Sequence, residues 1–197
     1  MQIREVKDEI RILGWDDSPF DSSVDENVPI VGSVVRGGKP YLDGVLVEEV
    51  TVDGFDATKK IAEASCSTKH KDQLRVIMLD GITFAGFNTV DIVEINEKTE
   101  LPVIVVTREN TNFESFREAM KRLPGFEERW ECVERAGDLK KLAMEKGNLY
   151  FQHNGIDEQK SKEILKMSAS NGLTPEPIRI SHLIASAIKR GESVGGA

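Results

Sequence analysis

Three aspartates at the ends of apolar segments are the residues of this sequence best suited to chemistry: Asp16, Asp53 and Asp80. Carboxylates that lie close together repel each other unless one is protonated or a cation sits between them. Hard divalent cations such as Mg²⁺ and Mn²⁺ take carboxylate oxygens as ligands, and a water molecule on such an ion can attack a phosphodiester. The pattern therefore predicts a Mg²⁺ or Mn²⁺ site formed by these three carboxylates. Asp17 and Asp56 are alternative ligands for its outer positions.

The segments that carry these aspartates are predicted to be strands of one sheet. Five apolar runs have the length and composition of strands: 10–15, 28–35, 41–52, 74–80 and 101–106. The first three are expected to form an antiparallel meander, because Gly37-Gly38 marks a hairpin turn. The last two are continuously apolar, which is typical of buried parallel strands joined by right-handed crossovers.

The rest of the chain is predominantly helical in pattern. Helices are predicted at 57–67, 88–100, 112–123, 126–146, 157–170 and 179–190, with a short strand at 148–152. Asp56 is placed to cap the first helix. The sequence therefore predicts an α/β fold with a mixed five-stranded sheet, three antiparallel strands followed by two parallel ones, and helices on both faces. No repeat or linker interrupts it, so residues 1–197 are expected to form a single domain.

The predicted topology brings two of the aspartates together. The first strand is expected to neighbour the fourth, at the point where the hairpins extend to one side and the crossovers to the other. Ligands of α/β sheets bind at the carboxyl ends of strands at such a switch point. Adjacent strands lie about 4.8 Å apart, so Asp16 and Asp80 are expected to face each other.

The composition limits the class of protein. The 197 residues carry 34 acidic and 26 basic side chains, a formal net charge of −8, which argues against binding of duplex nucleic acid through a bulk positive field. Two cysteines form no disulfide framework, and no apolar run is long enough to span a membrane, so a cytoplasmic protein is expected. The sequence contains neither a P-loop nor a dinucleotide-binding glycine motif.

Five further runs carry a family resemblance: GWDDSPF (14–20), VDGFDATKKIAE (52–63), VIMLDGITFAGFNTVDI (76–92), LPVIVV (101–106) and PEPIRISHLIASAIKRGES (175–193). They resemble an uncharacterised, mainly archaeal family, domain-of-unknown-function family 99, over essentially the whole chain. That family is similar to endonuclease V. The resemblance implies a ribonuclease H-like fold.

The resemblance to endonuclease V also implies site residues, since that enzyme cleaves nucleic acid near deaminated bases with Mg²⁺ held by acidic residues. Asp16 matches its first aspartate, and Asp80-Gly81 matches its Asp-Gly after an apolar strand. Asp53 lies nearest its glutamate. The segment 180–187 is similar to its Ser-x-Gly-His-x-Ile sequence, which implies that His182 lies beside the metal site.

Two segments differ from endonuclease V where that enzyme meets its substrate. Residues 40–44 resemble its strand-separating Pro-Tyr-x-Pro-Gly wedge, with Asp43 in place of the second proline. Residues 82–88 stand in place of a basic His-Pro-Arg-Arg stretch. Other basic residues suited either to phosphate contact or to solvated caps are Arg36, Lys39, Arg108 and Arg179.

Two functions fit these observations. The first is a divalent-metal-dependent nuclease that hydrolyses single-stranded or deaminated DNA or RNA, with the three aspartates as metal ligands and His182 orienting water or phosphate. The second is a non-catalytic module that binds nucleic acid, a nucleotide or a protein and retains a vestigial acidic site, as the acidic charge and the missing basic stretch favour. A third interpretation makes the aspartates ordinary turn residues, since Asp before Gly or Ser-Pro is common turn chemistry.

Overall fold

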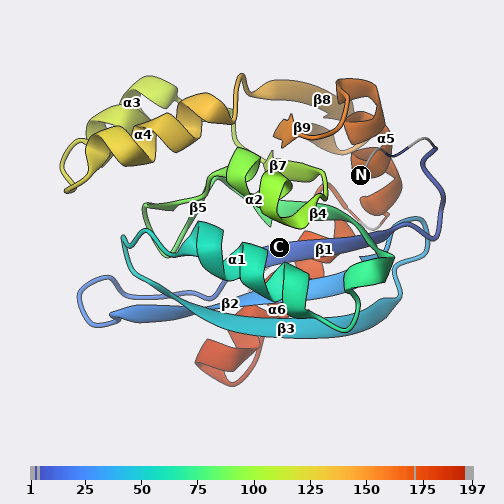
Figure 1. Ribbon diagram of the computed structural model, residues 1–197, viewed down its shortest axis with the longest axis horizontal. Helices are drawn as coiled ribbons and strands as arrows, with labels where there is room; N and C mark the ends of the chain where they lie inside the picture. Colours follow the sequence, from blue (N-terminus) through green and yellow to red (C-terminus); the bar gives the residue numbers. More distant parts are fainter. Residues whose placement is uncertain (1–2, 4, 171, 194–197) are drawn as a thin grey trace.

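A seven-stranded mixed sheet is the framework of the described residues, which are 3, 5–170 and 172–193 of the computed structural model (Figure 1). Its strands are β1 (Arg11–Asp17), β2 (Asn27–Arg36), β3 (Leu42–Thr51), β4 (Leu74–Asp80), β7 (Val103–Thr107), β8 (Lys140–Met144) and β9 (Gly147–Asn154). They are ordered β3-β2-β1-β4-β7-β9-β8. A separate small hairpin consists of β5 (Thr83–Phe84) and β6 (Asn88–Thr89).

Helices cover both faces of the sheet. They are α1 (Ala57–Ser67), α2 (Ile92–Thr99), α3 (Phe113–Met120), α4 (Phe126–Arg135), α5 (Glu158–Ser168) and α6 (Glu176–Arg190), with a short 3₁₀ turn at Lys71–Gln73. One apolar core contains Ile61 of α1 and Ile95 of α2, and a second core contains Ile164 of α5 and Ile178 of α6. Figure 1 shows α1 and α2 in front of the sheet and α6 behind it. Among the described residues, no helix is long and apolar enough to cross a membrane.

The predicted α/β architecture is confirmed in its first five main strands. Strands β1, β2 and β3 pair antiparallel, while β4 pairs parallel with both β1 and β7. The first strand therefore neighbours the fourth, as the sequence predicts. This pairing matters for function because it determines which strand ends share one edge of the sheet.

The predicted strand number is wrong, because the sheet continues beyond β7. Residues 140–144, expected to be the end of a long helix, form β8, and β9 joins it to β7 by antiparallel pairing. Helix α4 ends at Arg135, and Gly137 follows with a positive φ of 75°. Within β8 only Leu142 is buried, and such sparse apolar spacing fits a strand as well as a helix.

The start of one helix and the cap of another also differ from the prediction. Helix α2 begins at Ile92 rather than at Asn88, because Asn88 belongs to β6 and Asp91 caps the first turn by accepting hydrogen bonds from two amides. Asp56 precedes α1 but makes no side-chain cap. Its carboxylate instead accepts a 2.6 Å hydrogen bond from Asn88 Nδ2, and Asn88 Oδ1 accepts one from the Ala57 amide at 3.0 Å. An asparagine distant in sequence thus replaces the predicted cap.

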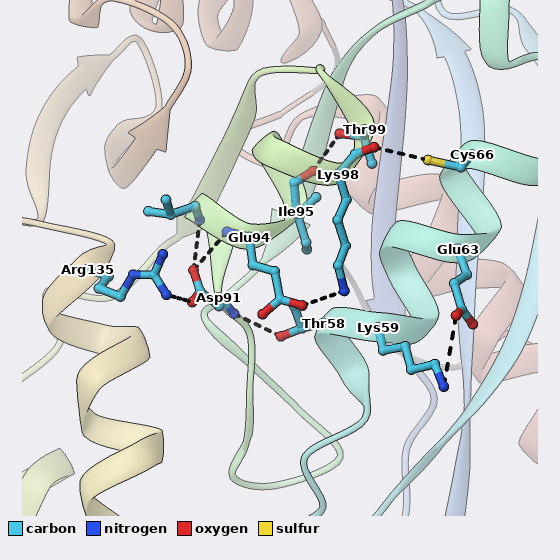
Figure 2. Close-up of polar contacts among 11 residues, drawn as sticks. Thr58, Lys59, Glu63, Cys66, Asp91, Glu94, Ile95, Lys98, Thr99 and Arg135 are labelled. Carbon is cyan, nitrogen blue, oxygen red and sulfur yellow. Dashed lines mark hydrogen bonds and ion pairs between the residues drawn. The ribbon is translucent and has the colours of Figure 1, made fainter.

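Polar contacts attach α4 to the first two helices. Figure 2 shows Arg135 of α4 paired with Asp91, whose own amide donates to Thr58 Oγ1 of α1 at 3.0 Å. Glu94 and Lys98 form an ion pair within α2. Because Asp91 is buried and caps α2, its pairing with Arg135 attaches the carboxyl-terminal end of α4 to the start of α2.

Candidate active site

Asp16 and Asp80 lie at the carboxyl ends of two adjacent parallel strands. The register pairs Trp15 of β1 with Leu79 of β4, and each aspartate follows directly. A pocket of about 400 Å³ opens at this point. Its lining residues are Asp16, Asp17, Ser18, Pro19, Phe20, Asp80, Arg108, Thr174 and His182. The structure therefore brings together three of the four predicted site residues, with Asp17 and Arg108 beside them.

Helix α6 brings His182 to the pocket through a buried hydrogen-bond network. Ser181 Oγ donates to the Gly14 carbonyl of β1 at 2.7 Å and accepts from the Ser33 amide of β2 at 3.1 Å. Ser33 Oγ donates to the Pro177 carbonyl at 2.7 Å. The helix is thereby held directly on β1 and β2, and the next residue, His182, places Nδ1 2.8 Å from Oδ2 of Asp16.

The carboxylates in the pocket are crowded and shielded from water. Burial, and after it the negative charge of Asp16, raises the pKa of Asp80 to about 7 and that of Asp17 to about 6. The positive charge of Arg108 opposes the shift at Asp80. The hydrogen bond with Asp16 raises the pKa of His182. Asp17 and Asp80 are half-buried acids that resist ionisation next to the buried Asp16, and a cation stabilises such an arrangement.

The oxygens of Asp16 and Asp17 already have protein partners. Asp16 Oδ1 accepts from the Asp17 amide at 2.8 Å, and Asp17 Oδ2 accepts from the Ala85 amide at 2.6 Å. Within residues 3, 5–170 and 172–193, no three His, Cys, Asp or Glu side chains stand ready around a metal position. The donor set nevertheless fits a hard divalent cation, since it consists of clustered carboxylates with unfavourable mutual charge. Binding there requires side-chain movement.

Asp53 does not line this pocket. It follows β3 with a positive φ of 50°, and its Oδ1 accepts a 2.8 Å hydrogen bond from the Phe87 amide. Asp56, the other alternative ligand, is held by the Asn88 side chain and the Thr51 amide. Of the alternatives considered from the sequence, Asp17 is the one that the structure places with Asp16 and Asp80.

The predicted phosphate-contacting residues separate in the structure. Arg108, after β7, lines the pocket, whereas Arg179 pairs with Glu176 and Arg36 pairs with Asp43. The segment 40–44 leads into β3 at the opposite end of the sheet, since Arg36 pairs with the first residue of β1. The segment that resembles a strand-separating wedge therefore lies about one strand length away from the pocket.

Sequence patterns gave no indication of several pocket residues. Ser18, Pro19 and Phe20 follow Asp17 directly, and only their position after the strand end could have suggested them. Thr174 lies just before α6 and has no chemical pattern around it. Asp17, named from the sequence as an alternative ligand, ends β1 next to Asp16, and both residues line the pocket.

We expect Asp16→Asn to lower the pKa of His182, because the hydrogen bond with Asp16 is the main cause that raises it. The carboxylate accepts from Nδ1 and stabilises the protonated ring, whereas the amide of asparagine carries no charge. NMR titration of the imidazole Cε1 proton measures the change. Asp43→Asn, at the far end of the sheet, should leave the His182 titration unchanged; an unaltered curve in Asp16→Asn would contradict the pairing.

Comparison with known proteins identifies the family. Residues 8–189 match the family described as endonuclease dU. The chain belongs to the endonuclease dU family. A UPF0215 protein from Methanothermobacter thermautotrophicus is 48% identical over 195 residues, covering 98% of this chain and 95% of that protein. The predicted resemblance to an archaeal, endonuclease V-like family is confirmed.

Solved structures agree with this assignment. A protein of unknown function from Archaeoglobus fulgidus superposes with a TM-score of 0.81 at 41% identity, covering 91% of this chain and 98% of that one. Endonuclease V from Streptomyces avermitilis superposes with a TM-score of 0.63 at 13% identity, covering 93% and 83%. At 13% identity, the similarity to endonuclease V shows that the two proteins share a fold.

Proposed function

We propose that this chain is a divalent-metal-dependent nuclease with its metal site at Asp16, Asp17 and Asp80. The observation that carries the proposal is the meeting of Asp16 and Asp80 at the carboxyl ends of adjacent parallel strands, in a pocket that also contains Arg108 and His182. Membership of the endonuclease dU family supports it. We also propose that the sheet is a ribonuclease H-like sheet extended by β9 and β8.

The side chains of the pocket have distinct proposed tasks. When bound by the carboxylates, a Mg²⁺ or Mn²⁺ ion supplies an activated water and neutralises charge on the scissile phosphate. His182 is oriented through Nδ1 by Asp16, which leaves Nε2 to contact water or a phosphate oxygen. Its raised pKa keeps the ring protonated to higher pH, so that it acts as a hydrogen-bond donor. Arg108 offers the guanidinium for a phosphate.

Asp53 has a different proposed task, which is to hold the loop before β6 rather than to bind metal. Its carboxylate already binds the Phe87 amide, and it lies outside the pocket lining. Asparagine adopts positive φ readily and retains an acceptor oxygen. Asp53→Asn is therefore the variant that separates the two roles, since a ligand would lose its charge whereas a loop contact would persist.

The proposed substrate is a single DNA strand that contains deoxyuridine. The family description names dU, and the net charge of −8 disfavours contact with a long duplex outside the pocket. An unpaired strand carries one phosphate backbone where a duplex carries two, which suits a pocket with a single lining arginine among the described residues.

We expect cleavage of labelled single strands containing one deoxyuridine in Mg²⁺ or Mn²⁺, and a loss of more than about 100-fold on chelation by EDTA. Matched strands that contain deoxyinosine, or no altered base, test whether the protein prefers deoxyuridine. RNA strands of the same sequence test whether it requires deoxyribose. Gel separation of the products measures the rate and the cleavage position.

Two results would contradict the proposal. Cleavage that persists in EDTA would show that the reaction does not require a divalent metal ion. Metal-independent binding of the strands with no cleavage in any cation would instead support the non-catalytic module.

A further inference from the structure

A buried arginine of α4 connects two loops, one of which donates a hydrogen bond to Asp17 of the acidic pocket. Arg129 is only 1% exposed. Its Nη1 donates to the carbonyls of Gly54, at 2.8 Å, and Phe87, and its Nη2 donates to the carbonyl of Asp53. Its Nε donates to the Pro124 carbonyl at 3.2 Å. One guanidinium therefore joins the turn after β3, the loop before β6 and the start of its own helix.

The chemistry of this arginine differs from that of a surface ion pair. The four hydrogen bonds seen in the described part of the chain all go to main-chain carbonyls. Burial lowers the pKa of Arg129, and the ring of Phe55 lies 3.9 Å from the guanidinium carbon. A buried cation is costly, and five donors in a planar fork are what several fixed carbonyls require. Lysine has neither the reach nor the planar geometry.

The two segments held by Arg129 adopt strained backbone conformations. Asp53 and Ala85 are non-glycine residues with positive φ, of 50° and 44°. At Gly86, with φ of 90°, a Cβ would lie 2.4 Å from Asp53 Oδ1. Such conformations persist only where surrounding contacts impose them, and they concentrate at functional sites.

A continuous series of hydrogen bonds leads from these segments to the pocket. The Asp53 amide donates to the Ala85 carbonyl at 2.9 Å, and the Phe87 amide donates to Asp53 Oδ1 at 2.8 Å. The Ala85 amide then donates to Asp17 Oδ2 at 2.6 Å. The Ala85 amide that binds the Asp17 carboxylate therefore belongs to the same loop as Phe87, whose carbonyl accepts from Arg129.

We propose that Arg129 is a positioning residue for the acidic pocket, holding the 85–87 loop so that the Ala85 amide orients the Asp17 carboxylate. Arg129 acts at a distance and contacts neither metal nor substrate. Only the expected effect of Arg129 on metal affinity rests on the proposed metal site. The loop geometry itself is a property of the metal-free protein.

Helix α4 offers a matched control for this proposal. Arg135 lies less than two turns further along the same helix and anchors it through the ion pair with Asp91. That contact, drawn in Figure 2, involves neither the 85–87 loop nor the turn after β3. Arg129→Lys and Arg135→Lys make the same chemical change on one helix, but only the first removes the connection to the pocket.

The test uses amide NMR signals of the full-length, metal-free protein in EDTA. We expect the Ala85 amide proton, shifted downfield by its short bond to a carboxylate, to move upfield in Arg129→Lys. We also expect Ala85 and Phe87 amide exchange to accelerate at least 10-fold in that variant. In Arg135→Lys both observables should stay as in the wild type. Titration with Mn²⁺ should show an affinity loss of about 10- to 100-fold in Arg129→Lys only, as for loss of an outer-sphere partner.

The outcomes distinguish this inference from the proposed function. An unchanged Ala85 signal in Arg129→Lys, or an equal change in Arg135→Lys, would overturn the positioning role. If Arg129→Lys does not fold, Arg129→Gln is the second variant, because its shorter, uncharged amide cannot join all of the carbonyls that Arg129 binds. There too an unmoved Ala85 signal overturns the positioning role. If wild type binds no Mn²⁺, the metal site fails, while the NMR result still decides the role of Arg129.

Discussion

Asp80→Asn should stabilise the metal-free protein and at the same time remove its metal affinity and nuclease activity. Burial and the charge of Asp16 raise the pKa of Asp80 from 3.8 to about 7, so the ionised carboxylate destabilises the fold at neutral pH. At about 1.4 kcal/mol per pKa unit the full shift corresponds to at most ~4 kcal/mol, and we expect a gain of about 1–3 because three carboxylates share the repulsion. Loss of a residue that only orients a metal ligand costs up to ~100-fold in activity. Because Asp80 is itself a proposed ligand, the activity of Asp80→Asn should fall by more than this.

The destabilising effect of Asp80 also predicts the direction in which the stability of the protein changes with pH. A carboxyl group whose folded pKa lies above its unfolded pKa binds its proton more tightly in the folded state. Wild-type stability in EDTA should therefore rise as the pH falls from 8 towards 5, and Asp80→Asn should show a smaller rise. Thermal unfolding in EDTA and in Mn²⁺ measures both effects, because only the wild type should gain stability from the ion.

Asp43→Asn is the matched control at the opposite end of the sheet. Arg36, with a smaller effect of Arg11, lowers the pKa of Asp43 to about 2. This carboxylate contributes stability above pH 3.8, which is lost as the pH falls towards 2, so its removal should destabilise the protein at neutral pH. It should leave Mn²⁺ binding unchanged. If Asp80→Asn instead binds Mn²⁺ like the wild type, the site assignment is wrong.

The location of the pocket could be predicted from the sequence because the relevant signals are local. Continuous apolar character distinguishes β4 as a central parallel strand, and the Gly37-Gly38 turn commits the first three strands to antiparallel pairing. Together these signals leave β1 as the neighbour of β4. The two strand-end acids then have to meet, and Asp16 and Asp80 line one pocket.

The rest of the site depends on contacts between residues that are distant in sequence. Asp17 ends β1 and Asp53 follows β3, but the left-handed turn at Asp53 directs its carboxylate to the Phe87 amide, which no local pattern shows. Arg129 is one of many charged residues on α4, and its burial arises only when three loops converge on it. The β8 strand was missed for the same reason, since pairing with β9 decides between two local patterns.

Gly14→Ala should separate α6 from β1 and destabilise the protein by at least the ~1–3 kcal/mol that overpacking a core costs. A Cβ at this position would lie 2.5 Å from the Pro177 carbonyl carbon and 2.6 Å from its carbonyl oxygen and Cβ. These are main-chain and ring atoms, which cannot rotate away, so the helix has to move. Ser181 then loses its 2.7 Å bond to the Gly14 carbonyl, and His182 moves away from Asp16.

Two measurements on Gly14→Ala test whether the packing of α6 on β1 positions His182 beside Asp16. Urea unfolding should show the loss of stability, and the His182 pKa should fall because the ring no longer bonds the Asp16 carboxylate. Gly172→Ala is the control, since a Cβ there would meet nothing within 4 Å. A variant that loses stability but retains the raised His182 pKa would mean that the pairing of His182 with Asp16 does not depend on how closely α6 approaches β1. The buried Ser33–Ser181 network would then be sufficient to hold the histidine in place.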